Sequence, residues 1–322
     1  MCKKLLVTGG AGFIGSQFVR DFKNEYAITV YDKLSYAGDL KRIENTEVIY
    51  RLVDIVEKEE LDRAIYCDEP DVIVHFAAET HVDRSIKDSR VFLDTNIIGT
   101  HNLLECCRGR NIKFIYISTD EVYGEIKEGK FTEESPLKPN NPYSVSKASA
   151  DMLVQSFIRT YNIRANIIRP CNNYGIWQYP EKLIPVVVYK ALTGQKIPVY
   201  GQGLQIREWL NIKDTVKAIK LIIEKAPNGE IYNVGSGEEE KNIVVVRSIL
   251  NILGKDESLI EFVKDRPGHD VRYCLDTTKI NNLGWKPEVK FYSGFLSSLK
   301  GGLEETVKWN EEHIDWLKSK LC

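Results

Sequence analysis

Apolar runs and amphipathic segments alternate along the first half of the chain. The apolar runs predict buried strands, at residues 5–8, 28–31, 71–77, 113–118 and 166–170. The segments between them carry apolar residues at helical spacing and predict helices, near residues 13–22, 58–66, 91–107 and 143–161. Because strands that alternate with helices form right-handed βαβ units, the pattern predicts an α/β fold with a doubly wound parallel sheet.

This alternation weakens after Pro170, where turn-forming Gly, Pro and Asn residues become frequent. We therefore expect a sheet domain at residues 1–170 and a smaller, discontinuous C-terminal substrate-binding domain at residues 171–322. Segments within residues 205–235 are regular enough to rejoin the first sheet.

Composition places the chain among globular proteins, with 43% hydrophobic and 28% charged residues. The formal net charge of -2 gives no case for binding nucleic acid or an anionic membrane surface. No apolar run approaches the roughly 18 residues of a membrane span, and none resembles a signal peptide. The seven cysteines lack CxxC spacing and the five histidines lack metal-ligand spacing, so we expect no metal and a reducing, cytoplasmic location.

A glycine-rich turn lies between the first predicted strand and helix, in the sequence TGGAGFIG. Gly9, Gly12 and Gly15 have the spacing and the context of a Rossmann-type dinucleotide site, with the phosphates at the helix N-terminus. The simpler interpretation is a plain glycine-rich turn.

Asp32 ends the second strand, where a carboxylate accepts the ribose hydroxyls and repels a 2′-phosphate, so NAD is favoured over NADP. A turn or capping Asp is the alternative. Asp54 is a weaker candidate for an adenine contact.

Two further segments carry candidate chemistry. Asp120 and Glu121 follow a buried strand, where acids are costly unless something uses them. In YSVSK, Tyr143 and Lys147 are four positions apart and share one helix face. A lysine ammonium beside a phenol, helped by a positive nicotinamide ring, favours phenolate and makes a base. A solvated helix face and two surface acids are the simpler interpretations.

These motifs together resemble the extended short-chain dehydrogenase/reductase family over nearly the whole chain. Within it, the sequence is similar to the dTDP-glucose 4,6-dehydratases, in DKLSYAG (32–38), AAETHVDRSI (77–86), STDEVYGE (118–125), NNYG with PEKLIP (172–185), PVYGQG (198–203) and DRPGHDVRY (265–273). The resemblance implies NAD as cofactor, a nucleotide-sugar substrate, most simply dTDP-glucose, and a homodimer built through the helices near 91–107 and 143–161.

The resemblance also implies a reaction. Tyr143 and NAD oxidise the sugar C4 hydroxyl, which acidifies the C5 proton. Glu121 then removes that proton while a protonated Asp120 gives its proton to the departing C6 hydroxyl, and hydride returns to C6. Thr119 shares alignment of the C4 oxygen with Tyr143, and Lys147 completes the catalytic set. Because relatives that only epimerise release no water, the Asp120 and Glu121 pair is the discriminating feature.

The remaining site residues come from the same resemblance. Cofactor contacts are expected from Gly9, Gly12, Phe13, Ile14, Gly15, Asp32, Lys33, Leu34, Ser35, Asp54, Ile55, Phe76, Ala77, Ala78, Thr95, Tyr143, Lys147 and Asn173. Substrate contacts are expected from Thr80, Thr119, Asn172, Lys182, Leu183, Pro198, Val199, Tyr200, Arg207, Asn242, Arg266 and His269. Among these, Arg207 and Arg266 would pair with the pyrophosphate, and Tyr200 would stack on the pyrimidine.

Three positions depart from the family pattern and bear on specificity, namely Arg169, Cys171 and Ile176. We expect them to alter a loop near the sugar, with Cys171 a small buried thiol. UDP-glucose 4,6-dehydration and nucleotide-sugar 4-epimerisation stay open as alternatives. A non-catalytic NAD-binding regulatory protein is the alternative from a different functional class, although it predicts erosion of the catalytic residues, which are all present.

Overall fold

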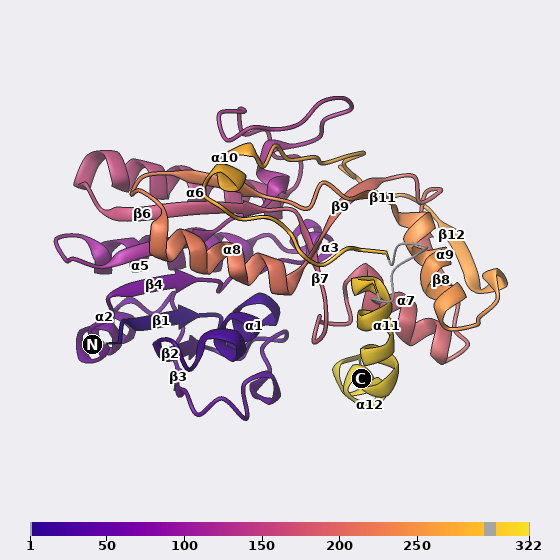
Figure 1. The fold of residues 1–322 in the computed structure, drawn as a ribbon, viewed down its shortest axis with the longest axis horizontal. Helices are drawn as coiled ribbons and strands as arrows, with labels where there is room; N and C mark the ends of the chain where they lie inside the picture. Colours follow the sequence, from indigo (N-terminus) through magenta and orange to yellow (C-terminus); the bar gives the residue numbers. More distant parts are fainter. Residues whose placement is uncertain (1, 293–300, 322) are drawn as a thin grey trace.

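The computed structural model describes residues 2–292 and 301–321 and has two lobes (Figure 1). The larger lobe contains a seven-stranded sheet built from β1 (Lys4–Thr8), β2 (Ala27–Asp32), β3 (Ile49–Leu52), β4 (Val72–His75), β5 (Lys113–Ile117), β6 (Arg164–Pro170) and β10 (Ile231–Val234). Its order is β10-β6-β5-β4-β1-β2-β3, and every neighbouring pair is parallel. The predicted doubly wound α/β fold is confirmed.

Alternate residues of each central strand face opposite sides of this sheet, so each face has its own core. On β5, Ile115 and Ile117 belong to the core that is covered by α1 (Phe13–Phe22) and α8 (Ile212–Lys225). Phe114 and Tyr116 face the other core, which is covered by α2 (Lys58–Asp68), α5 (Gly99–Cys107) and α6 (Pro142–Tyr161). Burial on both faces explains why these strands are continuous apolar runs.

The helix expected near residues 91–107 is interrupted by a wider turn. It consists of α4 (Arg90–Leu93), a π-helical segment (Asp94–Ile98) and α5. Asn96 lies in the π segment, where its amide accepts a hydrogen bond from the Glu79 N–H (2.9 Å) and donates one to the Glu79 carbonyl (3.0 Å). The segment therefore fixes the loop after β4, which is consistent with the frequent occurrence of π turns at functional sites.

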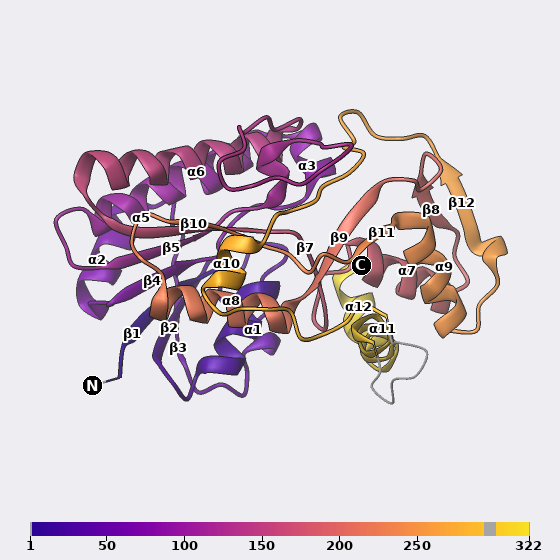
Figure 2. The ribbon, with the colours of Figure 1, turned by 45° about the horizontal axis from the view of Figure 1, so that its top comes forward.

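The smaller lobe lies beyond the carboxyl ends of the sheet strands (Figure 2). It has a three-stranded sheet of β7 (Asn172–Tyr174), β9 (Ile206–Asn211) and β11 (Glu239–Lys241), and a pair of β8 (Ile197–Tyr200) and β12 (Ile260–Val263). Its helices are α7 (Leu183–Leu192), α9 (Asn242–Ile252), α11 (Gly302–Glu312) and α12 (Ile314–Leu321). A separate apolar core joins β7, β8, β9, α7, α9 and α11, and β12 packs against it.

The chain passes more than once between the lobes. After β9, the chain enters α8, and then β10 pairs with β6 at the edge of the large sheet, with Arg169 opposite Asn233. Short elements complete the fold, namely α3 (Val82–Lys87), α10 (Thr278–Asn282) and the 3-10 helices at Leu40–Arg42, Asp120–Tyr123 and Glu257–Leu259. The segment from β9 to β10 therefore connects the smaller lobe to the edge of the large sheet.

Candidate active site

A cavity of about 600 Å³ lies between the lobes, above the carboxyl ends of the sheet strands. A smaller cavity of about 80 Å³ adjoins it over the end of β2, and Gly9 and Gly12 line both. Open parallel sheets bind ligands at this edge, and cavities of several hundred Å³ suit extended ligands. The two cavities therefore lie where a fold of this kind binds its ligands.

The glycine turn after β1 requires glycine at more than one position. Gly9 has a φ of +69°, and a Cβ atom there would lie 2.5 Å from the Ala77 backbone nitrogen. A Cβ atom on Gly15 would lie 2.4 Å from the Gly9 carbonyl oxygen. This close approach lets α1 begin directly at the turn, and the first N–H groups of a helix have no intrahelical acceptor. The turn therefore forms a cradle that fits a pyrophosphate.

Asp32 is held rigidly at the edge of the smaller cavity. Its Oδ2 accepts a hydrogen bond from the Ala11 N–H (3.0 Å), and its Oδ1 accepts one from the Leu34 N–H (2.8 Å). Burial raises the pKa of Asp32, and these two N–H groups oppose the shift. Nearby, the Thr95 hydroxyl is buried and finds no hydrogen-bond partner among the described residues. A carboxylate and a free hydroxyl at one small cavity fit the ribose and adenine end of a dinucleotide.

The structure places the other expected cofactor residues around the same two cavities. The smaller one is lined by Asp32, Lys33, Ser35, Asp54, Ile55, Phe76, Ala77, Ala78 and Thr95. The larger one is lined by Phe13, Ile14, Gly15, Tyr143, Lys147 and Asn173. Lys33 and Asp54 form an ion pair at 3.2 Å, so each of these two side chains already has a charged partner. Leu34 lines neither cavity and contributes its backbone N–H to Asp32.

Two capped segments bring the candidate catalytic residues together. After β5, Thr119 caps the 3-10 helix Asp120–Tyr123, and its Oγ1 accepts a hydrogen bond from the Glu121 N–H (3.3 Å). At the start of α6, Asn141 forms a reciprocal capping box with Ser144. This box starts the helix at Pro142, so that its first two turns present Tyr143 and Lys147 to the cavity. Thr119, Asp120 and Glu121 line the same cavity.

The two adjacent acids have different surroundings. Asp120 is 2% exposed, and burial, then the charges of Glu121 and Glu208, raise its pKa well above the ordinary value. Its Oδ1 accepts a hydrogen bond from the Thr119 hydroxyl (3.1 Å), and its Oδ2 has no partner within the described part of the chain. For Glu121, burial raises the pKa, and Arg207, Lys182 and Arg266 oppose the shift. Asp120 is thus the residue that keeps a proton, and Glu121 is the one beside cations.

Tyr143 and Lys147 differ from the sequence-based expectation in one respect. The pKa of Tyr143 is raised, by burial and then by Glu121, although a hydrogen bond with Thr119 opposes the shift. The Lys147 ammonium instead donates to the Ile117 carbonyl (2.6 Å) and lies 4.3 Å from the centre of the Tyr116 ring. Burial lowers the pKa of Lys147 to about 7. Burial therefore keeps the pKa of Tyr143 raised although Lys147 lies one turn further along the same helix.

The far end of the cavity carries the expected substrate residues, all of which line it: Thr80, Thr119, Asn172, Lys182, Leu183, Pro198, Val199, Tyr200, Arg207, Asn242, Arg266 and His269. Several buried polar atoms here lack a partner among residues 2–292 and 301–321: Asn172 Oδ1, Asn242 Oδ1, Gln205 Oε1, Trp209 Nε1 and Arg266 Nε. Because buried polar groups are nearly always paired in folded proteins, these atoms indicate a polar ligand.

The two arginines approach this end from different segments. Arg207, on β9, is 6% exposed and donates to the Asp270 carbonyl (2.9 Å). Arg266 lies 3.5 Å from Asp83, which also accepts a hydrogen bond from the Tyr200 hydroxyl (3.1 Å). Both arginines retain free donor positions that could meet an anionic ligand.

Of the three residues that depart from the family pattern, only Cys171 lines the larger cavity. Cys171 is 3% exposed, lines the cavity, and has a pKa that burial raises well above the ordinary value. Ile176 lies in the turn after β7 but not among the residues that line the cavity. The expectation that Arg169 alters a loop near the sugar is wrong, because this residue is 1% exposed on β6 and bonded to Asp151.

Sequence reasoning did not single out several residues that line the cavities. These include Glu79, Asp83, Gln205 and Tyr273. Glu79, Asp83 and Tyr273 stand inside motifs that carried the resemblance, AAETHVDRSI and DRPGHDVRY, and that position was the available signal. Only the fold brings them to the two adjoining cavities.

Among the described residues, no group of three or more His, Cys, Asp or Glu side chains is arranged to hold a metal ion. Within the same residues, no helix combines the length and the apolar character needed to cross a membrane.

Comparison with known proteins identifies relatives along the whole chain. The family model described as GDP-mannose 4,6 dehydratase matches residues 6–296. A dTDP-glucose 4,6-dehydratase from Neisseria meningitidis is 42% identical over 349 residues, covering 99% of this chain and 96% of the relative. The low-salt glycan biosynthesis protein Agl12 from Haloferax volcanii is 47% identical over 298 residues, covering 90% of this chain and 95% of the relative.

Solved structures show the same likeness. The crystal structure of DesIV, a dTDP-glucose 4,6-dehydratase from Streptomyces venezuelae with NAD bound, has a TM-score of 0.92 and 42% identity, covering 98% of this chain and 99% of that one. A UDP-glucose 4-epimerase from Thermus thermophilus in complex with NAD has a TM-score of 0.87 at 29% identity, covering 96% and 99%. The fold is thus common to dehydratases and epimerases, whereas identity is higher with the dehydratase.

Proposed function

This chain belongs to the GDP-mannose 4,6 dehydratase family of extended short-chain dehydrogenases/reductases, and on that premise we propose that it dehydrates dTDP-glucose with NAD. The product is dTDP-4-keto-6-deoxyglucose, and one water molecule leaves per turnover. The observation that carries the proposal is the buried Asp120, whose pKa is raised, beside Glu121 in the cavity that also holds Tyr143. An enzyme that only oxidises or epimerises has no use for this pair.

The cofactor would be held by the glycine cradle, by Asp32 at the ribose and by the Thr95 hydroxyl. When bound, NAD supplies an electron acceptor for C4 that is regenerated at C6, and its positive nicotinamide ring favours the Tyr143 phenolate. The raised pKa of Tyr143 in the chain alone supports the need for such a charge. A carboxylate at Asp32 would meet a 2′-phosphate with repulsion, which favours NAD over NADP.

Oxidation of C4 needs a base at its hydroxyl. Tyr143 takes that proton, and Thr119, which lines the same cavity, aligns the C4 oxygen. Lys147 lies one helical turn further on, and its side-chain nitrogen donates to the Ile117 carbonyl. These groups bind, orient and move one proton, and they leave a ketone at C4.

Loss of water then needs a base and an acid at the same time. Glu121 removes the C5 proton, which the new ketone has made acidic, and Asp120 gives its proton to the C6 hydroxyl as the C6–O bond breaks. The electron pair of the C5–H bond forms the C5–C6 double bond, and the hydroxyl leaves as water. Glu121 then returns its proton to C5 as the hydride taken from C4 adds to C6, which gives the 6-deoxy product. Burial that keeps Asp120 protonated and cations near Glu121 support these opposite roles.

The nucleotide end of the substrate would occupy the smaller lobe. Arg207 and Arg266 can pair with the two phosphates, and Tyr200 with His269 can border the pyrimidine. The unpartnered oxygens of Asn172 and Asn242 can accept hydrogen bonds from the sugar or base.

Mass spectrometry of the product tests the proposal. Purified protein with NAD and dTDP-glucose should release a product lighter by one water, and side-by-side rates with UDP-glucose should be lower. An isomerised sugar of unchanged mass would identify an epimerase instead. Binding of NAD without turnover of either sugar would identify a non-catalytic NAD-binding protein.

We also propose that the protein is a homodimer that packs the helices around α6 against a second copy. Val145 and Met152 stand seven positions apart on α6 and are 42% and 54% exposed, and Leu93 and Ile98 on the contacting helical segment are 38% and 47% exposed. An apolar surface of this kind marks an interface more often than a free surface.

Charge on that face tests the dimer. The double variant Val145→Glu with Met152→Glu should sediment as a monomer at micromolar concentration. A matched control is Phe262→Glu, which introduces one charge at a residue that is 57% exposed on β12 of the other lobe. Dissociation of the control, or persistence of the dimer in the double variant, contradicts the assignment.

A reducing compartment, the cytoplasm, is the proposed location. The six described cysteines are all free, and four of them are buried. Free thiols in this number support a reducing environment.

A further inference from the structure

A buried ion pair lies behind the catalytic residues and does not line either cavity. Arg169 on β6 and Asp151 on α6 join through two bonds of 2.8 Å each, from Nε to Oδ2 and from a terminal nitrogen to Oδ1. Their side chains are 2% and 0% exposed. Asp151 stands two turns beyond Tyr143 and one turn beyond Lys147 on the same helix.

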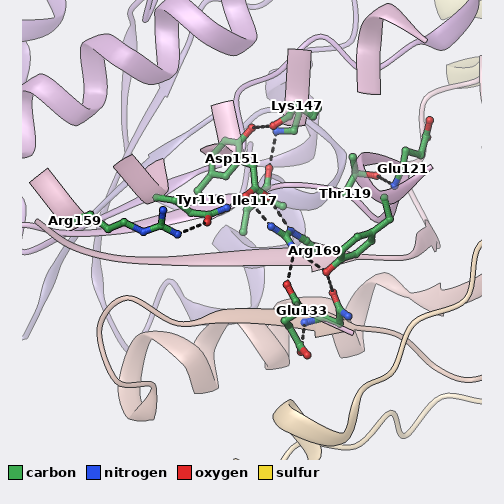
Figure 3. A network of polar contacts seen from close by, with 12 residues as sticks. Tyr116, Ile117, Thr119, Glu121, Glu133, Lys147, Asp151, Arg159 and Arg169 are labelled. Atoms are coloured by element: carbon green, nitrogen blue, oxygen red, sulfur yellow. Dashed lines mark hydrogen bonds and ion pairs between the residues drawn. The ribbon is translucent and has the colours of Figure 1, made fainter. Parts of the chain in front are cut away.

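The other end of the guanidinium reaches the segment that carries the acids. Arg169 donates to the Tyr123 hydroxyl (2.7 Å) and to the Glu133 carbonyl (3.2 Å), and it lies 4.8 Å from the centre of the Tyr123 ring. Tyr123 closes the 3-10 helix that begins with Asp120 and Glu121. Figure 3 shows Arg169 between Asp151 and Glu133, with Thr119, Glu121 and Lys147 nearby.

The network ends on a third element. The Tyr123 hydroxyl donates to Asn233 Oδ1 (2.7 Å), and the Asn233 N–H donates to Glu133 Oε1 (2.9 Å). Asn233 lies on β10, directly opposite Arg169. The hydrogen bonds of this network therefore connect α6, through Arg169 on β6 and Asn233 on β10, to the turn that ends at Tyr123.

Stability alone does not explain such a network. Desolvation of two buried charges offsets most of their attraction, and apolar side chains of similar volume often hold a fold as well or better. A planar guanidinium does what an apolar residue does not, because its donors have fixed angles and fix the positions of several acceptors at once. The better-supported use of a buried pair is therefore to set the register between elements.

We propose that Arg169 is a positioning residue that sets the turn bearing Asp120 and Glu121 in register with the helix bearing Tyr143 and Lys147. This inference rests on the proposed dehydration, in which the helix serves C4 and the turn serves C5 and C6 of the same sugar. An error of about 1 Å in such a placement lowers a rate about 10²-fold. The network links the two groups of residues without touching the substrate.

The variant Tyr123→Phe tests the link with a single oxygen atom. It keeps the ring that stacks on Phe131 at 4.9 Å and removes the bonds to Arg169 and Asn233. The turn should loosen while α6 keeps its bond to Arg169. Water elimination should then slow by about tenfold or more, and C4 oxidation should continue. The readout is the steady-state fraction of reduced cofactor, followed by absorbance during turnover, which should rise.

Arg169→Lys is the second variant, because it keeps the positive charge but cannot make the paired hydrogen bonds of the guanidinium to Asp151. It should show the same rise in reduced cofactor. The matched control is Arg51→Lys, since Arg51 and Asp68 form a similar forked pair (2.8 and 2.6 Å) at the surface near the opposite edge of the sheet. The control should keep the wild-type rate and the wild-type fraction.

The outcomes separate the possible failures. If Tyr123→Phe lowers oxidation and elimination in proportion, or changes neither, the network is only structural and the positioning role is overturned, whatever Arg169→Lys does. If the wild-type protein releases no water from dTDP-glucose, the proposed function fails instead. A loss of unfolding midpoint without a changed fraction of reduced cofactor also overturns the inference.

Discussion

Replacing Asp120 by Asn tests the proton on which the proposed reaction depends. In the wild-type structure Asp120 is 2% exposed, its Oδ1 accepts from Thr119, and its Oδ2 has no partner among the described residues. Asn has the same shape and is neutral, so it can replace a protonated carboxyl with little rearrangement. It cannot release a proton to the C6 hydroxyl.

The effect on rate follows from the loss of a general acid. Removing one typically lowers the rate about 10²- to 10⁴-fold, which is about 2.7–5.4 kcal/mol of activation free energy. Because C4 oxidation does not use Asp120, reduced cofactor should accumulate in the variant during the first turnover. Rapid mixing with dTDP-glucose, followed by absorbance and by mass spectrometry of quenched samples, measures both quantities.

Asp120→Asn should lower the rate of reaction but raise the stability of the fold at neutral pH. The ordinary pKa of this carboxyl, 3.8, applies in the unfolded chain, and burial raises the pKa in the folded state. The contribution of Asp120 to stability is therefore full below pH 3.8 and is lost as pH rises toward the folded value. Between the unfolded and the folded pKa, each pH unit costs about 1.4 kcal/mol of stability. Asn avoids this cost.

Asp120→Asn should therefore unfold at higher urea concentration than the wild type at pH 7, and the difference should shrink as pH falls toward 4. Asp276 is the control, because its pKa is lowered rather than raised, by hydrogen bonds from Thr278. Asp276→Asn should be less stable than the wild type above pH 3.8, and this difference should disappear as the pH falls through the lowered pKa of the folded state. A wild-type elimination rate in Asp120→Asn, or a stability difference that does not change with pH, would refute the reasoning.

Three further predictions follow from the geometry. Gly15→Ala should abolish NAD binding measured by calorimetry, because the new Cβ atom would lie 2.4 Å from the Gly9 carbonyl oxygen; unchanged affinity would contradict the cradle. Arg207→Lys should raise the KM for dTDP-glucose about tenfold with a smaller change in kcat, since a forked contact is lost; an unchanged KM would remove Arg207 from the phosphate site. Alkylation of the native protein followed by mass spectrometry should label exposed Cys2 but spare Cys171, which is buried and has a raised pKa; rapid labelling of Cys171 would contradict its burial.

Local patterns in the sequence predicted the sheet and the cofactor turn well, for physical reasons. Strands buried on both faces have to be apolar throughout, so the runs that end at Thr8, Ile117 and Pro170 were visible as strands. The glycines of the turn were visible because backbone packs where their side chains would be. Motif spacing also named residues that the structure places around two adjoining cavities.

Other properties depended on contacts between distant segments. The π turn that contains Asn96 interrupts a helix whose apolar pattern is continuous, because this side chain binds the Glu79 backbone on another loop. The role of Arg169 was misjudged for the same kind of reason. Its partners, Asp151 and Tyr123, are 18 and 46 positions away, so neighbouring residues carried no sign of the ion pair.

The sequence by itself determined the order of strands and helices, the glycine cradle and the identity of the acids, since these follow from local periodicity and residue type. Only the tertiary structure decided the state of those acids and bases. The pKa of Asp120 is raised by burial, then by Glu121 and by Glu208, which lies on β9, and the pKa of Tyr143 is raised by burial. Proton affinity is set by desolvation and by charges within a few ångströms, and the folded chain alone specifies these.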